Sequence, residues 1–587
     1  MRKEYAWRSL SIASFFILIG VLIILQIVRI QISVDGAGIR DIAEGNKGWL
    51  ETVYPARGEI YDRNGKLLAG NHNVVEVGVT LEQVNNPQSI ATVLSTVLDL
   101  DYFKILSAIN NAGEEQIYLR LTDYVSTEAA DNLKRIQGEF EEEIQNNPHQ
   151  GQDDLAGLTF RDHLGRSYPE ETIASNVIGF VNQSGRGFFG IEEKYNDLLA
   201  GIPVQVWVPA DPNRVEEIPQ VPDGATLILT IDRELQAATE ATLDQSLYDY
   251  GAQAGTIIVM DPKNGEILAM ASTPRLDLSN FSEYYQVFNN ASEYNRAINM
   301  PYEPGSVFKI LTMAAALDLG VVSPGTTYID TGIFSFGGTN IQNWDQGAWG
   351  VQDMTGCLQN SLNVCLAWIA VDIGTDNFYQ YMSRFGIGHP TGIDLSGEAG
   401  GRLKIPGDAD WYPVDLATNS FGQGISTTPI QMMMAASAIA NEGKMVTPHI
   451  LYGMVRDEKQ YNFPPQDAGR PISRETARTL NEMLANSLAD GNSEALIPGY
   501  RLAGKTGTAQ IPTEYGWYSD DETNASFIGW GPVDDPQFMI YVWLEKPTSS
   551  SWASYTAAPV FAQVAEDTTM LLNIPPDMIR QQFVSGQ

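Results

Sequence analysis

The sequence has little cysteine, little histidine and few basic residues. Its 587 residues include 2 Cys and 5 His, and 36 Lys and Arg stand against 72 Asp and Glu. Two cysteines are too few for a disulfide framework, and the histidines show no metal-like spacing, so we expect no metal and no cofactor. The net charge of −36 argues against a nucleic-acid partner, which needs a basic surface. What remains is a globular composition, 43% hydrophobic, in a chain long enough for two or three domains.

The two cysteines, Cys357 and Cys365, lie on either side of Ser361. This placement also suits a redox switch or a catalytic thiol. On one continuous helix, however, the pair would stand about 12 Å apart, which is too far for a disulfide. We therefore expect both residues to be buried as small, unpaired hydrophobic side chains.

A long hydrophobic run is present at the N-terminus, over residues 9–28. It has about the length that crosses the hydrocarbon core of a membrane. Arg2, Lys3 and Arg8 precede it, which predicts a cytoplasmic tail and an exported remainder. A cleaved signal peptide is the alternative, but its small-residue candidate, Gly36–Gly38, lies well beyond the run. The run therefore predicts an uncleaved single-pass anchor in the cell membrane.

The exported part shows two regions separated by a proline-rich passage at residues 203–222. In the first region, Asn64-Gly65 between apolar runs predicts a hairpin, and residues 126–144 predict a charged, exposed helix. In the second, hairpins near both ends and helices between them predict a partly antiparallel sheet with helices on its faces. We expect an α+β protein with four parts: a tail (1–8), an anchor (9–28), a mainly β or mixed domain (50–221) and a larger domain with a helical subdomain (222–587).

Three short motifs follow one another in the second region, and the first is Ser306-Val-Phe-Lys309. A Ser-x-x-Lys pattern occurs about once by chance in a chain of this size. Here the apolar residues that follow it, up to Gly320, predict a buried helix that begins close to Ser306. A lysine buried there has a lowered pKa and can act as a base toward the serine, while the helix N-terminus can hold an oxyanion. The structural alternative is a helix cap followed by a lysine that reaches solvent.

The second motif is Ser361-Leu-Asn363, which we expect in a loop. Its hydroxyl can relay a proton and its amide can hold a substrate amide, but such triplets are frequent in loops.

The third motif, Lys505-Thr506-Gly507-Thr508, overlaps a full match to the phosphate-loop pattern from Gly499 to Thr506. A phosphate loop follows a strand and opens a helix, whereas this segment has a turn before it and extended residues after it. We therefore expect a strand over residues 501–510, on which Lys505 and Thr508 can bind a carboxylate and Gly507 allows a ligand backbone to approach.

With these motifs in this order, the chain resembles the class B, monofunctional penicillin-binding proteins, which are D,D-transpeptidases of bacterial cell-wall synthesis. The resemblance extends over nearly the whole chain. It includes four further groups of residues: the segment from Arg57 to Gly65, the Arg166 and Glu192 segments of an N-terminal pedestal, the segment from Asp261 to Met270 with Asn295-Arg296, and Phe421-Gly-Gln-Gly424. One departure is Leu362, where the family often has serine; it leaves the catalytic side chains intact.

The resemblance implies a role for each motif. Ser306 would attack the penultimate D-alanine carbonyl of a peptidoglycan stem peptide, with Lys309 as base. Ser361 would relay protons, and Asn363 would position the substrate. The terminal carboxylate would bind Lys505, Thr506 and Thr508 beside Gly507, and the backbone N–H groups of Ser306 and Thr508 would form the oxyanion hole. β-Lactams would acylate Ser306 as inhibitors.

The resemblance also implies partner proteins, and two alternative functions remain to be weighed against it. A membrane-embedded glycan polymerase of the SEDS type is expected beside the enzyme, together with division or elongation proteins. One rival is a carboxypeptidase or β-lactamase that passes the acyl group to water. The other is a catalytically silent scaffold or a β-lactam sensor. The three intact motifs argue against the silent scaffold, and the short tail argues against the sensor.

Overall fold

The computed structural model describes residues 2–32, 48–113, 116–146, 154–209, 219, 221–288, 293–491, 493–512 and 518–585. The chain divides into two compact units, residues 1–56 with 201–224, and residues 57–200 with 225–587. Each unit is described by itself below.

The first unit contains one long helix and one strand pair. Helix α1 (Arg2–Ile32) includes a 20-residue apolar stretch, Leu10–Arg29, that is long enough to cross a membrane and is not buried by the protein. Strand β1 (Gly48–Val53) pairs antiparallel with β8 (Val204–Pro209). The Gly36–Gly38 cleavage candidate lies outside the described residues.

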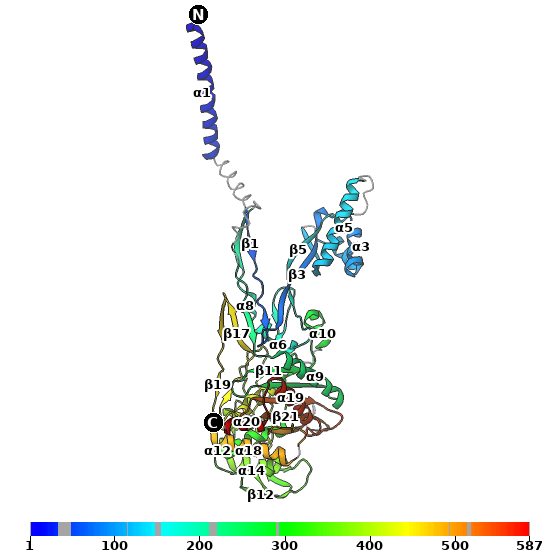
Figure 1. The fold of residues 1–587 in the computed structure, drawn as a ribbon. Coiled ribbons are helices and arrows are strands. Elements are labelled where there is room, and N and C mark those ends of the chain that lie inside the picture. The colour runs from blue at the N-terminus through cyan, green and yellow to red at the C-terminus, as the bar shows by residue number, and fades with distance from the viewer. Residues whose placement is uncertain are drawn as a thin grey trace. The chain divides into compact units, whose positions relative to one another are not determined.

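In the second unit, the N-terminal region is built around the long strand β3 (Leu67–Thr80) (Figure 1). It pairs antiparallel with β2 (Ile60–Tyr61), β4 (Tyr118–Ser126) and β5 (Leu158–Ser167), and the β2–β3 connection contains the predicted Asn64-Gly65 turn. Helices α3 (Pro87–Leu98), α4 (Tyr102–Asn110) and α5 (Thr127–Asn146) cover a separate hydrophobic core. Helix α5 confirms the predicted charged helix.

Glu192 joins three segments of this region through a buried ion cluster. Its carboxylate accepts from Arg57 Nε and from Arg166 Nε, each at 2.7 Å. The glutamate side chain is fully buried, and the two arginines are almost so. The segments around Arg57, Arg166 and Glu192, far apart in sequence, are therefore fixed to one another.

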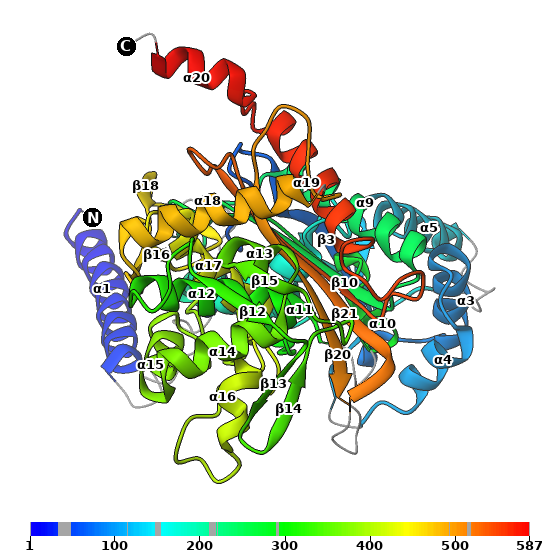
Figure 2. The same cartoon turned by 90° about the horizontal axis from the view of Figure 1, so that it is seen from below.

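The C-terminal region contains a five-stranded antiparallel sheet in the order β11 (Ile267–Ser272), β10 (Ala254–Met260), β22 (Phe538–Glu545), β21 (Tyr518–Gly531) and β20 (Ala503–Pro512). Both predicted hairpins are confirmed by β10–β11 and β21–β22. Helices α9 (Arg233–Tyr250) and α19 (Ala557–Leu571) pack on one face through one core cluster. Helices α12 (Lys309–Asp318), α17 (Pro429–Ala440) and α18 (Arg474–Asp490) lie on the other side (Figure 2).

A helical subdomain supplies the second motif. Its elements are β12 (Thr327–Asp330), β13 (Ile333–Phe336), β14 (Thr339–Gln342), β15 (Gly350–Asp353), α13 (Met354–Gln359), α14 (Asn363–Ile373), α15 (Thr375–Arg384) and α16 (Pro413–Asn419). The strands form the pairs β12–β15 and β13–β14.

A second, mixed sheet runs in the order β18-β17-β9-β2-β3-β4, where β9 is Thr226–Leu229, β17 is Leu451–Arg456 and β18 is Lys459–Asn462. The shorter elements are η1 (Leu81–Gln83), α6 (Ser175–Ile178), β6 (Phe180–Val181), β7 (Gly187–Phe188), α7 (Gly190–Lys194), α8 (Asn196–Ala200), η3 (Leu278–Glu283), α10 (Tyr284–Val287), α11 (Arg296–Asn299), η4 (Gly305–Phe308), β16 (Met445–Val446), β19 (Asp467–Gly469) and α20 (Asp577–Ser585). The sequence did not predict α20. The α+β class is confirmed.

Candidate active site

Ser306 and Lys309 lie at the start of a buried helix, as the sequence predicts. Ser306 is in the 3-10 turn η4, which continues directly into α12 at Lys309. A 3-10 turn has three residues, so side chains three positions apart lie one above the other. Lys309 is 0% exposed, whereas Ser306 is half-buried and open to a ligand. The alternative of a lysine that reaches solvent is therefore wrong.

Lys309 contacts the second motif directly. Its Nζ donates to the Ser361 carbonyl oxygen at 2.6 Å and to Asn363 Oδ1 at 2.8 Å, and lies 3.1 Å from Ser361 Oγ. Burial, and then the positive charge of Lys505, hold the pKa of Lys309 well below its usual value. The lowered pKa makes the neutral amine, with a lone pair that can take a proton, more accessible than for an exposed lysine.

Ser361 lies in a tight turn that ends α13, rather than in an open loop. Its backbone is left-handed, with φ at 53°. Its N–H donates to Leu358 O at 3.2 Å, and the next N–H, of Leu362, donates to Cys357 O at 3.0 Å. These two bonds form a Schellman motif with Ser361 at the position that usually holds glycine. Asn363 begins α14 immediately afterwards.

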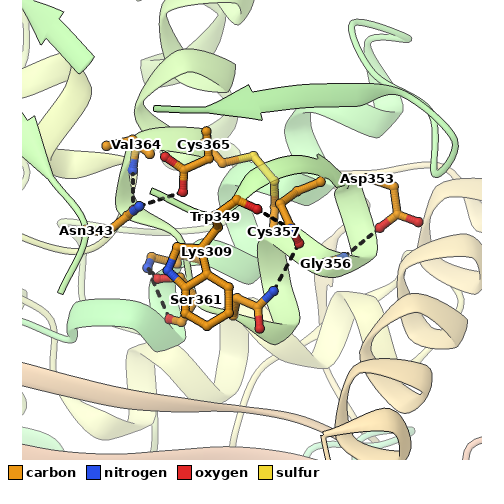
Figure 3. Close-up of a disulfide and its surroundings, with 12 residues drawn as sticks. Lys309, Asn343, Trp349, Asp353, Gly356, Cys357, Ser361, Val364 and Cys365 are labelled. Carbon is orange, nitrogen blue, oxygen red and sulfur yellow. Dashed lines mark hydrogen bonds between the residues drawn. A yellow bond between two sulfur atoms is a disulfide. The ribbon is translucent and has the colours of Figure 1, made fainter. Parts of the chain in front are cut away.

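The expectation that Cys357 and Cys365 are unpaired is wrong, because they form a disulfide (Figure 3). The expectation rested on one continuous helix. The turn at Ser361 instead separates α13 from α14, and it brings the two Cα atoms to 6.2 Å. Both cysteines are fully buried, as predicted.

The third motif lies on β20, the edge strand of the five-stranded sheet, which confirms a strand and excludes a phosphate loop. Lys505 is 3% exposed, and burial lowers its pKa to about 7. Its Nζ lies 3.2 Å from both the carbonyl and hydroxyl oxygens of Thr506. Thr508 Oγ1 accepts from the Ala553 N–H at 3.2 Å.

Two glycines allow the third motif to approach the first. A Cβ on Gly507 would lie 2.9 Å from the Val307 side chain and 3.0 Å from the Pro304 carbonyl oxygen. A Cβ on Gly305 would meet Ala509 Cβ at 2.9 Å. The backbone of β20 therefore lies directly against the turn that carries Ser306, and the electrostatic effect of Lys505 on Lys309 agrees with this proximity. The structure thus brings all three motifs to one place.

A second loop, not assigned a role from the sequence, supports the Ser306 turn. The Gly305 N–H donates to Gly422 O at 3.1 Å, and the Gly424 N–H donates to the Glu303 carboxylate at 2.9 Å. The Tyr518 hydroxyl donates to the same carboxylate at 3.0 Å. The two glycines of Phe421-Gly-Gln-Gly424 were the sequence feature from which a supporting role of this loop could have been predicted.

Two half-exposed tryptophans flank the second and third motifs, and no sequence pattern pointed to them. Trp344 Nε1 donates to Asn360 O at 3.1 Å, next to Ser361. The Trp344 ring meets the Trp552 ring edge-on, with centroids 4.9 Å apart, and Trp552 precedes the residue that donates to Thr508. The two tryptophan rings therefore form a continuous aromatic surface between the segment of the second motif and that of the third.

Comparison with known families agrees with this geometry. Residues 255–566 match the penicillin binding protein transpeptidase domain, and residues 52–213 match the penicillin-binding protein dimerisation domain. The chain belongs to the class B penicillin-binding proteins. This penicillin-binding protein is 32% identical to stage V sporulation protein D of Bacillus subtilis over 97% of its own length and 86% of the relative's. It is 28% identical to the peptidoglycan D,D-transpeptidase FtsI of Escherichia coli K12, with coverage of 92% and 88%.

Solved structures show the same fold. Penicillin binding protein 3 of Mycobacterium tuberculosis, complexed with aztreonam, matches with a TM-score of 0.68 and 26% identity, over 90% of this chain and 98% of that one. The three motifs described above therefore lie in a penicillin-binding transpeptidase domain.

Proposed function

We propose that the protein cross-links peptidoglycan through an acyl-enzyme on Ser306. The observation that supports this most directly is the buried Lys309 amine, one 3-10 turn from Ser306 and hydrogen-bonded to Ser361 and Asn363. An amine whose pKa is lowered by burial can take the proton of the Ser306 hydroxyl as its oxygen attacks the penultimate D-alanine carbonyl.

The tetrahedral intermediate then needs a place for its negative oxygen. The backbone N–H groups of Ser306 and Thr508 are the proposed donors, since η4 and β20 lie against each other. When the intermediate collapses, the peptide C–N bond breaks, and the proton from Lys309 passes through Ser361 Oγ to the leaving D-alanine amine. In the second half of the reaction the amine of a neighbouring stem attacks the ester carbonyl and forms the new amide bond. The ester C–O bond to Ser306 then breaks, and a proton from the attacking amine passes by way of Ser361 Oγ and Lys309 to the Ser306 oxygen, which restores the hydroxyl.

The third motif is the proposed carboxylate site. The terminal carboxylate of the stem would bind Lys505 and the hydroxyls of Thr506 and Thr508, with Gly507 leaving room for the substrate backbone. The carboxylate would favour the charged form of Lys505, whose pKa burial lowers to about 7. A β-lactam carries a carboxylate and an acyl group in similar places and acylates Ser306 in the same way.

We place this site on the outer side of the membrane. The basic residues Arg2, Lys3 and Arg8 before the span favour a cytoplasmic N-terminus. The Cys357–Cys365 disulfide supports the same side, because disulfides persist in oxidising compartments. A separate membrane-embedded glycan polymerase of the SEDS type, in a division or elongation assembly, would supply the glycan strands.

The test is a reaction of the full-length protein in detergent with a pentapeptide stem and a second stem that offers a free amine. We expect release of D-alanine together with a cross-linked dimer, and neither with Ser306→Ala. Release of D-alanine without any dimer would contradict transpeptidation and would favour the carboxypeptidase alternative.

A further inference from the structure

The Cys357–Cys365 disulfide links the residues on either side of the second motif. Cys357 lies four residues before Ser361 in α13, and Cys365 lies four residues after it in α14, so the bond closes a short loop centred on Ser361. Both sulfur atoms belong to fully buried residues in the same core as Lys309's helix. The loop therefore contains the Ser361 and Asn363 acceptors of the Lys309 amine (Figure 3).

The backbone inside this loop is held in an unfavourable conformation. A non-glycine residue is less stable in the left-handed region than in the right-handed one, because its Cβ comes close to the neighbouring carbonyl oxygen. Ser361 has φ at 53°, and the Cys357 carbonyl accepts the Leu362 N–H that completes the turn. Cys357 therefore does two things: its sulfur forms one end of the disulfide, and its carbonyl oxygen accepts the hydrogen bond that closes the turn.

The left-handed turn also determines what Lys309 contacts. It directs both the carbonyl and the hydroxyl oxygen of Ser361 to Lys309 Nζ, at 2.6 and 3.1 Å. Non-covalent contacts also hold this segment. They include the burial of the Leu362 and Val364 side chains and four hydrogen bonds: Trp344 Nε1 to Asn360 O, Asn360 Nδ2 to Gln352 Oε1, Asn363 Nδ2 to Gln342 O, and the Val364 N–H to Asn343 Oδ1. The disulfide is the covalent restraint across the turn.

We propose that the Cys357–Cys365 disulfide is a positioning element that holds Ser361 and Asn363 on the Lys309 amine, so that acylation of Ser306 depends on the intact bond. The inference rests on the proposed function of Ser306. Reduction adds two electrons and two protons to the S–S bond and gives two thiols, while a dithiol such as dithiothreitol is oxidised to its cyclic disulfide. Without the bond, α13 and α14 can separate and the turn can relax toward a right-handed Ser361.

Relaxation of the Ser361 turn should change the pKa of Lys309, which a simple loss of folding stability would not do. The groups that face Lys309 are the neutral Ser361 and Asn363, from the turn and α14, and the cationic Lys505, from β20. Opening the turn admits water to the amine and weakens the burial that depresses its pKa. The pKa then rises toward the usual lysine value, and a higher pH is needed to make the amine neutral.

The test compares the full-length oxidised protein in detergent with the same sequence reduced by dithiothreitol and with the variant Cys357→Ala/Cys365→Ala. Free thiols are counted by maleimide labelling and mass spectrometry. Ile369→Val is the matched control, because it truncates a buried α14 residue away from the turn. The measurements are the second-order rate constant of acylation by a fluorescent penicillin across pH, and the melting temperature.

We expect the double variant and the reduced protein to acylate about tenfold more slowly or worse, since small misplacements of reacting groups are costly. The acidic limb of the pH profile should move to higher pH, and reoxidation should restore the reduced sample. Ile369→Val should keep the wild-type profile. Unchanged or faster acylation in the double variant would overturn the proposal, and so would a slower rate with an unmoved acidic limb. Absence of labelling in the oxidised wild-type protein would instead contradict the proposed function of Ser306.

Discussion

The residues that matter most at the smallest scale are two buried lysines with different neighbours. Burial lowers the pKa of both, and the positive charge of Lys505 lowers the pKa of Lys309 in addition. The two side chains therefore suit different tasks in the proposed reaction. The lowered pKa of Lys309 favours its neutral form, which can accept a proton, while Lys505, with a pKa of about 7, can bind a carboxylate as a cation.

This separation predicts a bell-shaped pH profile for acylation by a β-lactam. The rate constant should rise with pH as Lys309 loses its proton, and fall as pH passes about 7 in the free enzyme, where Lys505 loses its own. Stopped-flow labelling across pH measures both limbs. In Lys505→Arg the side chain stays charged, so the alkaline limb should move far upward. An alkaline limb that stays in place in this variant would contradict the assignment to Lys505.

At the scale of elements, the Ser306 turn is set by backbone contacts with its neighbours. Gly422 has φ at 82°, and a Cβ there would overlap the backbone of Gly305. The loop that follows α16 therefore packs against η4 without any side chain between them. The position of Ser306 depends on this contact as well as on α12.

Gly422→Ala should displace the Ser306 turn and lower the acylation rate by at least about tenfold. Gly320→Ala is the matched control, because Gly320 also has a positive φ, 69°, but faces open space at the end of α12. It should cost only the backbone strain, about 1–2 kcal/mol, and leave the acylation rate of the folded protein unchanged. Equal acylation rates in the two variants would contradict the steric argument.

The buried ion cluster of the N-terminal region gives a prediction for stability. Glu192→Gln would leave Arg57 and Arg166 as buried cations without their carboxylate, at a cost of about 3–5 kcal/mol. Glu234→Gln removes an exposed partner of Lys66 instead, and should change stability far less, because solvent screens this pair. Urea denaturation followed by tryptophan fluorescence measures both. Similar losses in the two variants would mean that the cluster does not hold the three segments together.

The sequence predicted elements well where local pattern determines them. The Asn64-Gly65 turn, the two hairpins of the main sheet, the helix after Ser306 and the strand through Lys505 all follow from apolar periodicity and turn residues. A loop was expected at Ser361-Leu-Asn363, but the distance between Cys357 and Cys365 was still taken from one continuous helix. Nothing in Asn360-Ser-Leu362 resembles the glycine that usually forms the tight left-handed turn found there, and that turn is what brings the two cysteines together. The supporting contacts of Gly422 and Trp344 were missed for another reason: they join segments distant in sequence.

At the scale of the whole molecule, the apolar helix α1 and the acidic charge of the chain bear on where in the cell the enzyme acts. The Leu10–Arg29 stretch is unburied, and the chain carries a net charge of −36. We propose that the helix holds the catalytic domain on the outer side of the membrane, which agrees with the proposed substrate and with a disulfide that would persist in an oxidising compartment.

Protease treatment of intact cells after removal of the outer wall layers tests this arrangement. We expect digestion of the domain after residue 48, with the segment that contains α1 retained in the membrane fraction. Mass spectrometry of the extracted full-length protein should also find the N-terminal residues still attached. A mature protein that begins beyond Gly38 would contradict the anchor and support a cleaved signal peptide.

In the proposed reaction, Ser306 is acylated with the help of Lys309, Ser361 and Lys505. The most direct measurement is intact-protein mass spectrometry of the full-length chain after incubation with penicillin, followed by peptide mapping of the adduct. We predict one penicilloyl group, located on Ser306, with no adduct in Ser306→Ala and a rate reduced by orders of magnitude in Lys309→Met. An adduct on another residue, or one that persists in Ser306→Ala, would contradict the account.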